Sequence, residues 1–241
     1  TKTEYDILGR VIGQSVPTEV SVSGSTWTPA GNDSSGYKWT YQKYDWMGRV
    51  VRKINTDGNP AASENDSDVF INYSTCGCAG GLETTIEGEK VPRTDTTGTA
   101  RRKQKMYQDI LGRTFKTETF DWAGNVYLRT EHDFNGRNQI TQTDQTDLAA
   151  DPDVTQTATA TFDGHGRLAS SHRPEQRDGS TLKYTTYSYN QDDSIQTVTD
   201  ARGAVTTYTY ENAGGVPKRP LVTGISWTVP GGSGITDPTD V

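Results

Sequence analysis

Residues 108–137 read QDILGRTFKTETFDWAGNVYLRTEHDFNGR, and this stretch repeats the pattern Asp-x-x-Gly-Arg/Asn three times. The copies begin at Asp109, Asp121 and Asp133, so each step is 12 residues long. A fixed internal step indicates that one small structural unit recurs along the chain. Twelve residues hold one strand and one turn, so the stretch predicts consecutive β-hairpins.

Three further copies lie outside this stretch, which makes six, and a weaker version is Asp200-Ala201-Arg202-Gly203. The six copies place these residues at equivalent turn positions: Tyr5, Asp6, Gly9 and Arg10; Tyr44, Asp45, Gly48 and Arg49; Asp109, Gly112 and Arg113; Asp121 and Gly124; Asp133, Gly136 and Arg137; Asp163, Gly166 and Arg167.

The residue types explain the turn. An Asp carboxylate can accept hydrogen bonds from backbone N–H groups ahead of it, and Gly tolerates the positive φ that closes a type I turn with a bulge. The flanking segments alternate in the manner of strands, as in residues 184–189 and 206–210. We therefore predict an all-β fold in which each copy is a hairpin tip with a structural role.

One continuous repeat region, residues 1–227, is the simplest organisation. Segments rich in Ser, Asn, Asp, Gly and Pro predict longer hairpin loops at about 16–36, 59–72 and 141–153. Residues 228–241 lack the repeat and contain Pro and several Gly, which is typical of a tail or linker.

Composition excludes several classes of function. The net charge of -7 argues against a nucleic-acid binder, because such proteins neutralise phosphates with Lys and Arg. No apolar run is long enough for a membrane-spanning helix. Hydrophobic residues make up only 31% of the chain, so little material is present for a core, whereas 9% aromatic residues argue against disorder.

The Tyr-Asp-x-x-Gly-Arg copies, the Thr-Tyr-x-Tyr strands before them and the variant Thr199-Asp200-Ala201-Arg202-Gly203 resemble the YD-repeat or RHS-repeat family, from about Thr3 to Trp227. The resemblance implies a spiralling antiparallel β-sheet of consecutive hairpins, which forms a segment of a hollow β-shell. Bacterial members of the family enclose a toxin domain, and animal teneurins use a related shell in adhesion. The chain is shorter than a family shell requires, and it lacks a convincing match to the family's autocleavage region.

We therefore expect a structural wall segment of a secreted or cell-surface bacterial protein, in a hollow shell or in a multi-copy tube or fibre. The chain opens on Thr1 without an initiating Met, which suggests processing from a longer precursor. Expected partners are the rest of that polypeptide or identical copies that pair through β-edges, with a toxin-like cargo or a surface glycan as ligand. No cofactor is expected.

Two other classes of function stay open. A carbohydrate-binding adhesion module is the alternative, with Trp27 as the candidate ligand contact, because aromatic faces pack on sugar rings. Trp46 and Trp122 share one slot of the repeat turn, which favours packing against a neighbouring strand. A hydrolase on the β scaffold comes third. The repeat Asp residues have turn roles and no nucleophile motif is present, so we expect no enzyme.

Cys76 and Cys78 are the only cysteines. Two thiolates do not complete a tetrahedral zinc shell, and no metal site is expected. Free thiols, a local disulfide and a covalent link to a neighbouring chain all remain open, and a local disulfide is favoured because an exported protein would be oxidised.

Overall fold

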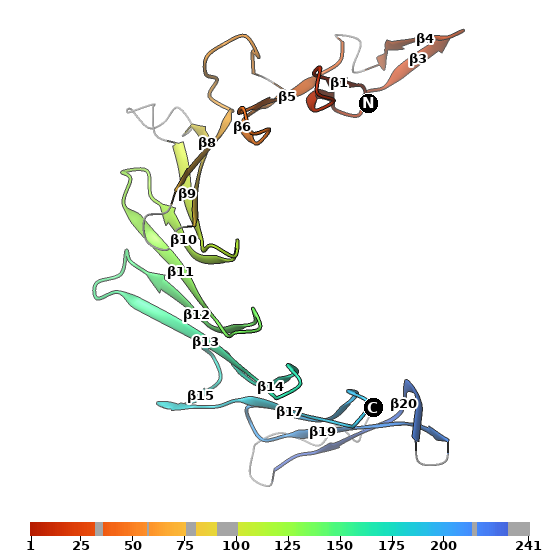
Figure 1. Cartoon of the computed structure of the whole chain (residues 1–241), viewed down its shortest axis with the longest axis vertical. Helices are drawn as coiled ribbons and strands as arrows, with labels where there is room; N and C mark the ends of the chain where they lie inside the picture. The colour runs from red at the N-terminus through yellow and green to blue at the C-terminus, as the bar shows by residue number, and fades with distance from the viewer. Residues whose placement is uncertain (32–35, 57, 76–80, 91–100, 214–215, 231–241) are drawn as a thin grey trace. The chain divides into compact units, whose positions relative to one another are not determined.

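The computed structural model describes residues 1–31, 36–56, 58–75, 81–90, 101–213 and 216–230, with the backbone alone for 212, 213 and 216–220. No α-helix occurs in these residues. The strands, drawn in Figure 1, are β1 (Thr3–Tyr5), β2 (Val11–Ser15), β3 (Val20–Ser23), β4 (Thr26–Pro29), β5 (Trp39–Tyr44), β6 (Val50–Ile54), β7 (Val69–Thr75), β8 (Leu82–Lys90), β9 (Arg101–Gln108), β10 (Thr114–Phe120), β11 (Val126–Phe134), β12 (Ile140–Asp147), β13 (Val154–Phe162), β14 (Leu168–His172), β15 (Arg177–Asp178), β16 (Thr181–Leu182), β17 (Thr185–Tyr189), β18 (Ile195–Thr199), β19 (Val205–Ala213) and β20 (Val216–Thr228).

Sixteen of these strands form one open antiparallel sheet, which confirms the predicted all-β hairpin architecture. The order is β1-β2-β5-β6-β7-β8-β9-β10-β11-β12-β13-β14-β17-β18-β19-β20, so neighbours in the sheet are neighbours in the chain apart from two excursions. The excursions are the separate hairpins β3–β4 and β15–β16. Among the described residues, strands β1 and β20 each have a single neighbour and are the edges of the sheet.

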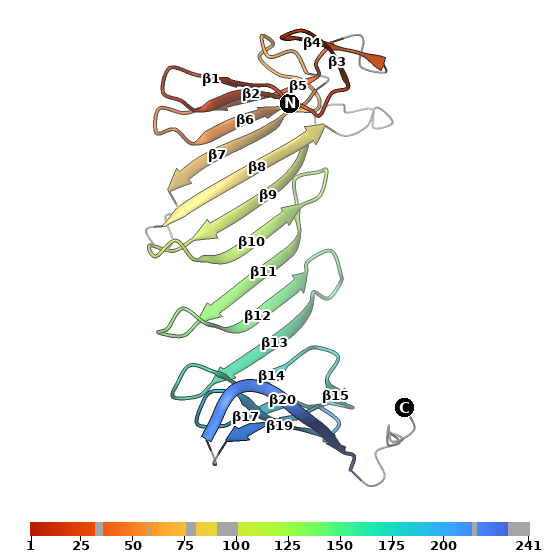
Figure 2. The same ribbon diagram turned by 90° about the vertical axis from the view of Figure 1, so that its right-hand side faces the viewer.

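The chain divides into two compact units, which are described separately. The first comprises Thr1–Arg129 with Leu148–Asp151, and the second comprises Thr130–Asp147 with Pro152–Val241. Within the first unit, the hairpins β7–β8 and β9–β10 lie side by side, as Figure 2 shows.

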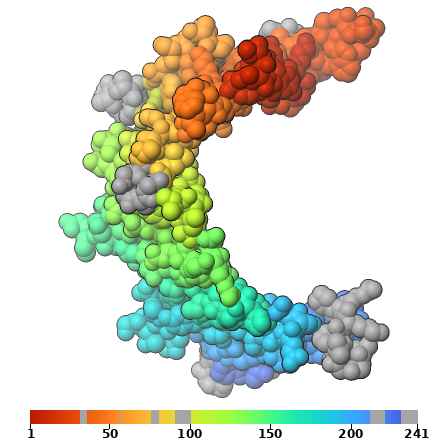
Figure 3. All heavy atoms as spheres, viewed as in Figure 1, coloured from red at the N-terminus to blue at the C-terminus, as the bar shows by residue number. Residues whose placement is uncertain are grey.

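Each unit is a single layer of strands and side chains (Figure 3). Among the described residues, only Ile54 and Tyr107 are buried hydrophobic side chains. The scarcity of apolar residues in the sequence therefore has a direct structural result: the described residues form no extended apolar core, and many apolar side chains of the sheet are only half-buried. Backbone ladders and cross-strand polar pairs also stabilise the sheet, such as Ser188 with Thr197 at 2.6 Å between hydroxyl oxygens.

The turn at Asp109 shows how the repeat closes. The Gly112 N–H donates to the Asp109 carbonyl at 3.0 Å, and Gly112 has a φ of 77°. Oδ1 of Asp109 accepts the backbone N–H groups of Leu111 and Arg113, and Oδ2 accepts Nε of Arg113 at 2.7 Å. The pairing register shifts just after the turn, as a bulge requires. Asp6, Asp45 and Asp163 make the same set of bonds.

Two related turns use other side chains. At Asp121 the partner is Asn125, whose amide donates to Oδ2 of Asp121 at 3.1 Å. The weaker copy at Asp200 also forms a turn, in which Gly203 has a φ of 88° and Arg202 donates to the carboxylate.

The predicted turn at Asp133, Gly136 and Arg137 is wrong by two residues. Strand β11 runs through Asp133 to Phe134, and the turn spans Asn135 to Gln139, with the positive φ of 63° on Asn138. The physical reason is that Asn135 follows an aromatic residue at the end of a strand and bonds the backbone as Asp does elsewhere. Asn can adopt the left-handed region, so the turn does not need Gly.

All three expected loops contain strand residues. The segment 141–153 includes most of β12, because the Thr-rich residues 141–147 form a strand that pairs with β13 from Gln142 to Asp147. The segment 16–36 contains the β3–β4 hairpin. The loop expected at 59–72 ends earlier, where β7 begins at Val69. The last strand ends at Thr228, and residues 231–241 of the expected tail lie outside the described residues.

Candidate functional site

A repeated contact joins each hairpin to the next one at the tips. In the first unit, the guanidinium of Arg10 lies over the Tyr44 ring, 4.5 Å from its centroid. The Tyr44 hydroxyl donates to the carbonyl of Val11 at 2.6 Å. Arg10 closes its own turn with Asp6, so one side chain links two hairpins. We call this pair of contacts the Arg–Tyr clasp.

The clasp recurs with the same geometry. Arg49 lies 4.3 Å from the Tyr73 ring, and the Tyr73 hydroxyl donates to Val50 at 3.1 Å. In the second unit, Arg167 lies 4.4 Å from the Tyr189 ring, and that hydroxyl donates to Leu168 at 2.8 Å. In each case the accepting carbonyl belongs to the residue after the Arg. A cation over an aromatic face contributes about 0.5–1 kcal/mol at exposed sites.

Variants of the clasp occur where the sequence departs from the repeat. Tyr210 donates to the carbonyl of Ile195 at 2.7 Å, although Ser194 stands in the place of the Arg. At the shifted turn, Gln139 donates to the Gly166 carbonyl at 2.6 Å, and Arg137 donates to the Gly164 carbonyl at 2.7 Å. These side chains therefore still connect one hairpin tip with the next.

The turn carboxylates are held in their charged form. Hydrogen bonds from the Arg113 side chain lower the pKa of Asp109, and the backbone N–H of Arg10 lowers the pKa of Asp6. An ionised carboxylate that accepts three or four hydrogen bonds is a turn element, and its oxygens are directed at the backbone rather than at a ligand. This geometry gives the repeat Asp residues a structural role.

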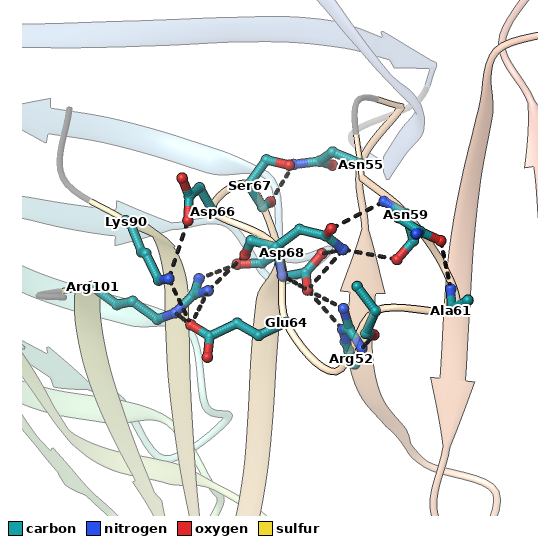
Figure 4. A network of polar contacts seen from close by, with 12 residues as sticks. Arg52, Asn55, Asn59, Ala61, Glu64, Asp66, Ser67, Asp68, Lys90 and Arg101 are labelled. Carbon is teal, nitrogen blue, oxygen red and sulfur yellow. Dashed lines mark hydrogen bonds and ion pairs between the residues drawn. The ribbon is translucent and has the colours of Figure 1, made fainter. Parts of the chain in front are cut away.

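A second polar network fastens the loop between β6 and β7 to the sheet (Figure 4). Asp68 is fully buried, and its Oδ2 accepts Nε of Arg52 at 2.7 Å and the backbone N–H of Asn65 at 2.8 Å. Arg101 donates to the carbonyls of Asn65, Asp68 and Gly88. Its ion pair with Glu64, at 2.8 Å, lowers the pKa of that carboxyl. The network therefore latches the loop.

A third cluster lies on strands β8 to β11 of the first unit. The Tyr107 hydroxyl donates to Oε2 of Glu118 at 2.8 Å, and Nζ of Lys116 lies 3.9 Å from the Tyr107 ring centroid. Burial raises the pKa of Tyr107, so the phenol stays protonated at neutral pH. For Glu118, burial acts to raise the pKa, but the Tyr107 hydrogen bond and the Lys116 charge outweigh it and the pKa is lowered. The cluster is an internally paired charge network.

The tips expose apolar side chains that the repeat pattern did not predict to be exposed. Trp46 is 91% exposed, so the expectation that it packs against a neighbouring strand is wrong. The reason is that Asp45 closes the turn beneath it and directs the two middle turn residues into solvent. Trp122 is 42% exposed and lies 5.6 Å from the Arg102 guanidinium.

The other candidate residues are placed as follows. Trp27 lies in strand β4 of the separate β3–β4 hairpin and is 60% exposed. Cys76 and Cys78 lie outside the described residues. The described part of the chain holds no group of three or more His, Cys, Asp or Glu side chains suited to a metal ion. Nor does it contain a helix long and apolar enough to cross a membrane.

No protein-family model and no curated protein matches this sequence. A solved structure of a Photorhabdus luminescens Tc holotoxin pore, carrying a mutation in TccC3, aligns at a TM-score of 0.27 and 10% identity, over 87% of this chain and 13% of that chain. A crystal structure of TcdB2-TccC3-TEV aligns at a TM-score of 0.23 and 12% identity, over 95% and 14%. This chain thus spans about one seventh of the length of the chains that it matches.

The fold and the clasps define the class of protein. The chain forms an open, single-layer antiparallel sheet of consecutive hairpins, and Arg and Tyr side chains connect neighbouring hairpin tips.

Proposed function

We propose that the chain is a structural wall segment of a YD/RHS-type repeat protein, continued by further strands at its two edges. The observation that carries the proposal is the open sheet with edges at β1 and β20. Unpaired strand edges present rows of backbone donors and acceptors, which pair with another strand unless something covers them.

The β20 edge supports continued pairing, whereas β1 has only three residues. Strand β20 has 13 residues, and its exposed side chains include Leu221, Val222, Ile225 and Trp227. A protein that kept such an edge free would be expected to blunt it with inward charges or a short strand. Residues 217–220 of β20 contain Pro and Lys, which discourage pairing, so it is the apolar part of the strand, residues 221–227, that suits a sheet that carries on into the next strand.

In this proposal the wall belongs to a secreted or cell-surface bacterial protein, as a part of a hollow shell or of a multi-copy tube or fibre. Its partners are the rest of a longer polypeptide or identical copies, and the space that it bounds holds a toxin-like cargo. The wall itself carries out no catalysis, because the described clusters of titratable groups are engaged in turns, latches and paired charges.

Static light scattering over a range of protein concentrations tests the wall. We expect species heavier than the 26.4 kDa chain to form as concentration rises. Ile225→Lys, which places a charge on the β20 edge, is expected to suppress them. Ile7→Lys is the matched control at a hairpin tip and leaves association unchanged. A monomer at every concentration contradicts the multi-copy tube or fibre and leaves only the wall that belongs to a longer polypeptide.

One observation favours a second candidate, the carbohydrate-binding adhesion module. Trp27 is 60% exposed on a hairpin outside the main sheet, where its ring can stack on a sugar. Saturable quenching of tryptophan fluorescence by a polysaccharide, lost in Trp27→Ala and kept in Trp46→Ala, would support this function. Quenching that is equal in both variants would count against it.

A further inference from the structure

The first aromatic residue of the repeat, Tyr5, stands where a clasp is incomplete. It ends strand β1, at the edge of the sheet, and is 60% exposed. Tyr44 occupies the equivalent position at the end of its strand, Tyr73 lies two residues before the end of β7, and both are partly buried beneath an Arg. Among the described residues, no cation lies over the Tyr5 ring, and its hydroxyl has no acceptor.

The clasps of Tyr44 and Tyr73 indicate which partner would complete a clasp at Tyr5. Tyr44 ends β5, and its Arg comes from the turn that begins β2, the strand paired with β5. Tyr73 lies two residues before the end of β7, and its Arg comes from the turn that begins β6, the strand paired with β7. The partner of each Tyr is thus an antiparallel strand that starts immediately after a Gly-Arg turn.

We propose that the β1 edge binds a β-hairpin with an Asp-x-x-Gly-Arg turn, whose Arg stacks on Tyr5 and whose next carbonyl accepts the Tyr5 hydroxyl. This inference rests on the proposed wall function and specifies the chemistry of one of its joints. It extends the interface already formed between consecutive hairpins of the sheet. The edge supplies the ring, the hydroxyl and the outer backbone groups of β1, and the partner supplies the cation and the strand.

The test uses a dye-labelled, cyclised peptide with the sequence of residues 39–55, which carries the turn from Asp45 to Arg49. Fluorescence anisotropy measures its binding to the full chain, at concentrations where light scattering finds only monomer. We expect Tyr5→Leu to weaken binding about tenfold, since it removes both a cation–π contact and a hydrogen bond. Tyr127→Leu, at a 41% exposed Tyr outside any clasp, leaves binding unchanged.

A second peptide, with Arg49→Gln, completes the test. We expect this peptide to bind the wild-type chain about tenfold more weakly than the parent peptide does. The two peptides should bind the Tyr5→Leu chain equally well, because the cation–π contact is already lost there. If the parent peptide binds the wild-type chain and Tyr5→Leu equally well, the peptide binds at another edge. This result would overturn the inference about Tyr5 but would not contradict the proposed wall function.

Two other outcomes would also overturn the inference. Oligomers that form without peptide and are lost in Tyr5→Leu would identify a second copy of the chain as the occupant. A chain that binds neither peptide and stays monomeric at every concentration would contradict the wall function as well.

Discussion

The side chain of Arg10 joins two hairpins, since it donates to Asp6 in its own turn and lies 4.5 Å from the ring centroid of Tyr44 in the next. The two residues are 34 positions apart in the sequence, yet the repeat brings them together because the intervening segment returns as the neighbouring strand. This relationship explains why Tyr, Asp, Gly and Arg recur together. Asp and Gly form the turn, Arg bonds to the turn Asp, and the Tyr ring contacts the Arg of the preceding hairpin.

The hydroxyl of the clasp contributes to stability. Tyr44→Phe removes the 2.6 Å hydrogen bond to Val11 and leaves a carbonyl without that donor. We expect a loss of about 1 kcal/mol in the free energy of unfolding, measured by urea denaturation. Tyr127→Phe is the control, because its hydroxyl has no partner among the described residues. Equal stability of Tyr44→Phe and the parent would contradict the clasp.

The turn glycine has a defined conformational role. Gly112 has a φ of 77° and open space around it, so the cost of Gly112→Ala is conformational and is expected to be about 1–2 kcal/mol. Gly136 is the matched control, because it also has open space but no positive φ. Gly136→Ala should therefore leave the melting temperature nearly unchanged. A similar loss in both variants would show that the turn is at Asp133 after all.

Low pH is expected to destabilise the hairpin turns. The folded-state pKa of Asp109 lies below its ordinary value of 3.8, and Asp6, Asp45 and Asp163 are shifted the same way. A depressed folded pKa gives a contribution to stability that is present above that ordinary value and is lost as pH falls through the folded pKa. The urea concentration at the midpoint of unfolding should therefore decrease as the pH is lowered below about 4.

The carboxylate at one tip can be tested by substitution. Asp109→Asn is expected to lower stability at pH 7 and to reduce the fall between pH 4 and pH 2. Asp133→Asn, at an exposed strand position, should change neither. A pH profile of Asp109→Asn identical in shape to that of the parent would contradict the assigned ion pair with Arg113.

The buried pair in the loop latch should be sensitive to removal of one partner. Asp68→Ala leaves Arg52 buried without its carboxylate, and we expect a loss of about 3–5 kcal/mol in the free energy of unfolding. Asp66→Ala removes a 76% exposed partner of Lys90 and should cost no more than about 1 kcal/mol. Similar small losses in both variants would show that Asp68 does not carry the latch.

Local chemistry made part of this fold predictable. Asp109 and Gly112 lie three residues apart and define a turn by themselves, so the hairpin tips and the antiparallel sheet follow from the sequence. The turn at Asn135 was misplaced because Asn138, and not a Gly, takes the positive φ. For the same reason, the turn from Asn190 to Ser194, with Asp193 at a φ of 67°, was missed.

A different signal would have found both of those turns. Phe134 and Tyr189 are aromatic residues immediately before the turn acceptor, as Tyr5 and Tyr44 are in the clear copies. The clasps could not be predicted in this way, because an Arg and a Tyr more than 20 residues apart meet only when the pairing of strands is known. The exposure of Trp46 likewise depends on which way the closed turn directs its middle residues.

Amide hydrogen exchange of the monomeric and the associated chain tests the central claim most directly. We predict that the inner strands β9 and β10 are protected in both states, whereas β1 and β20 exchange rapidly in the monomer and become protected on association. Protection of β1 and β20 in the monomer, equal to that of β9 and β10, would mean that the chain covers its own edges, and it would contradict a wall that continues into further strands.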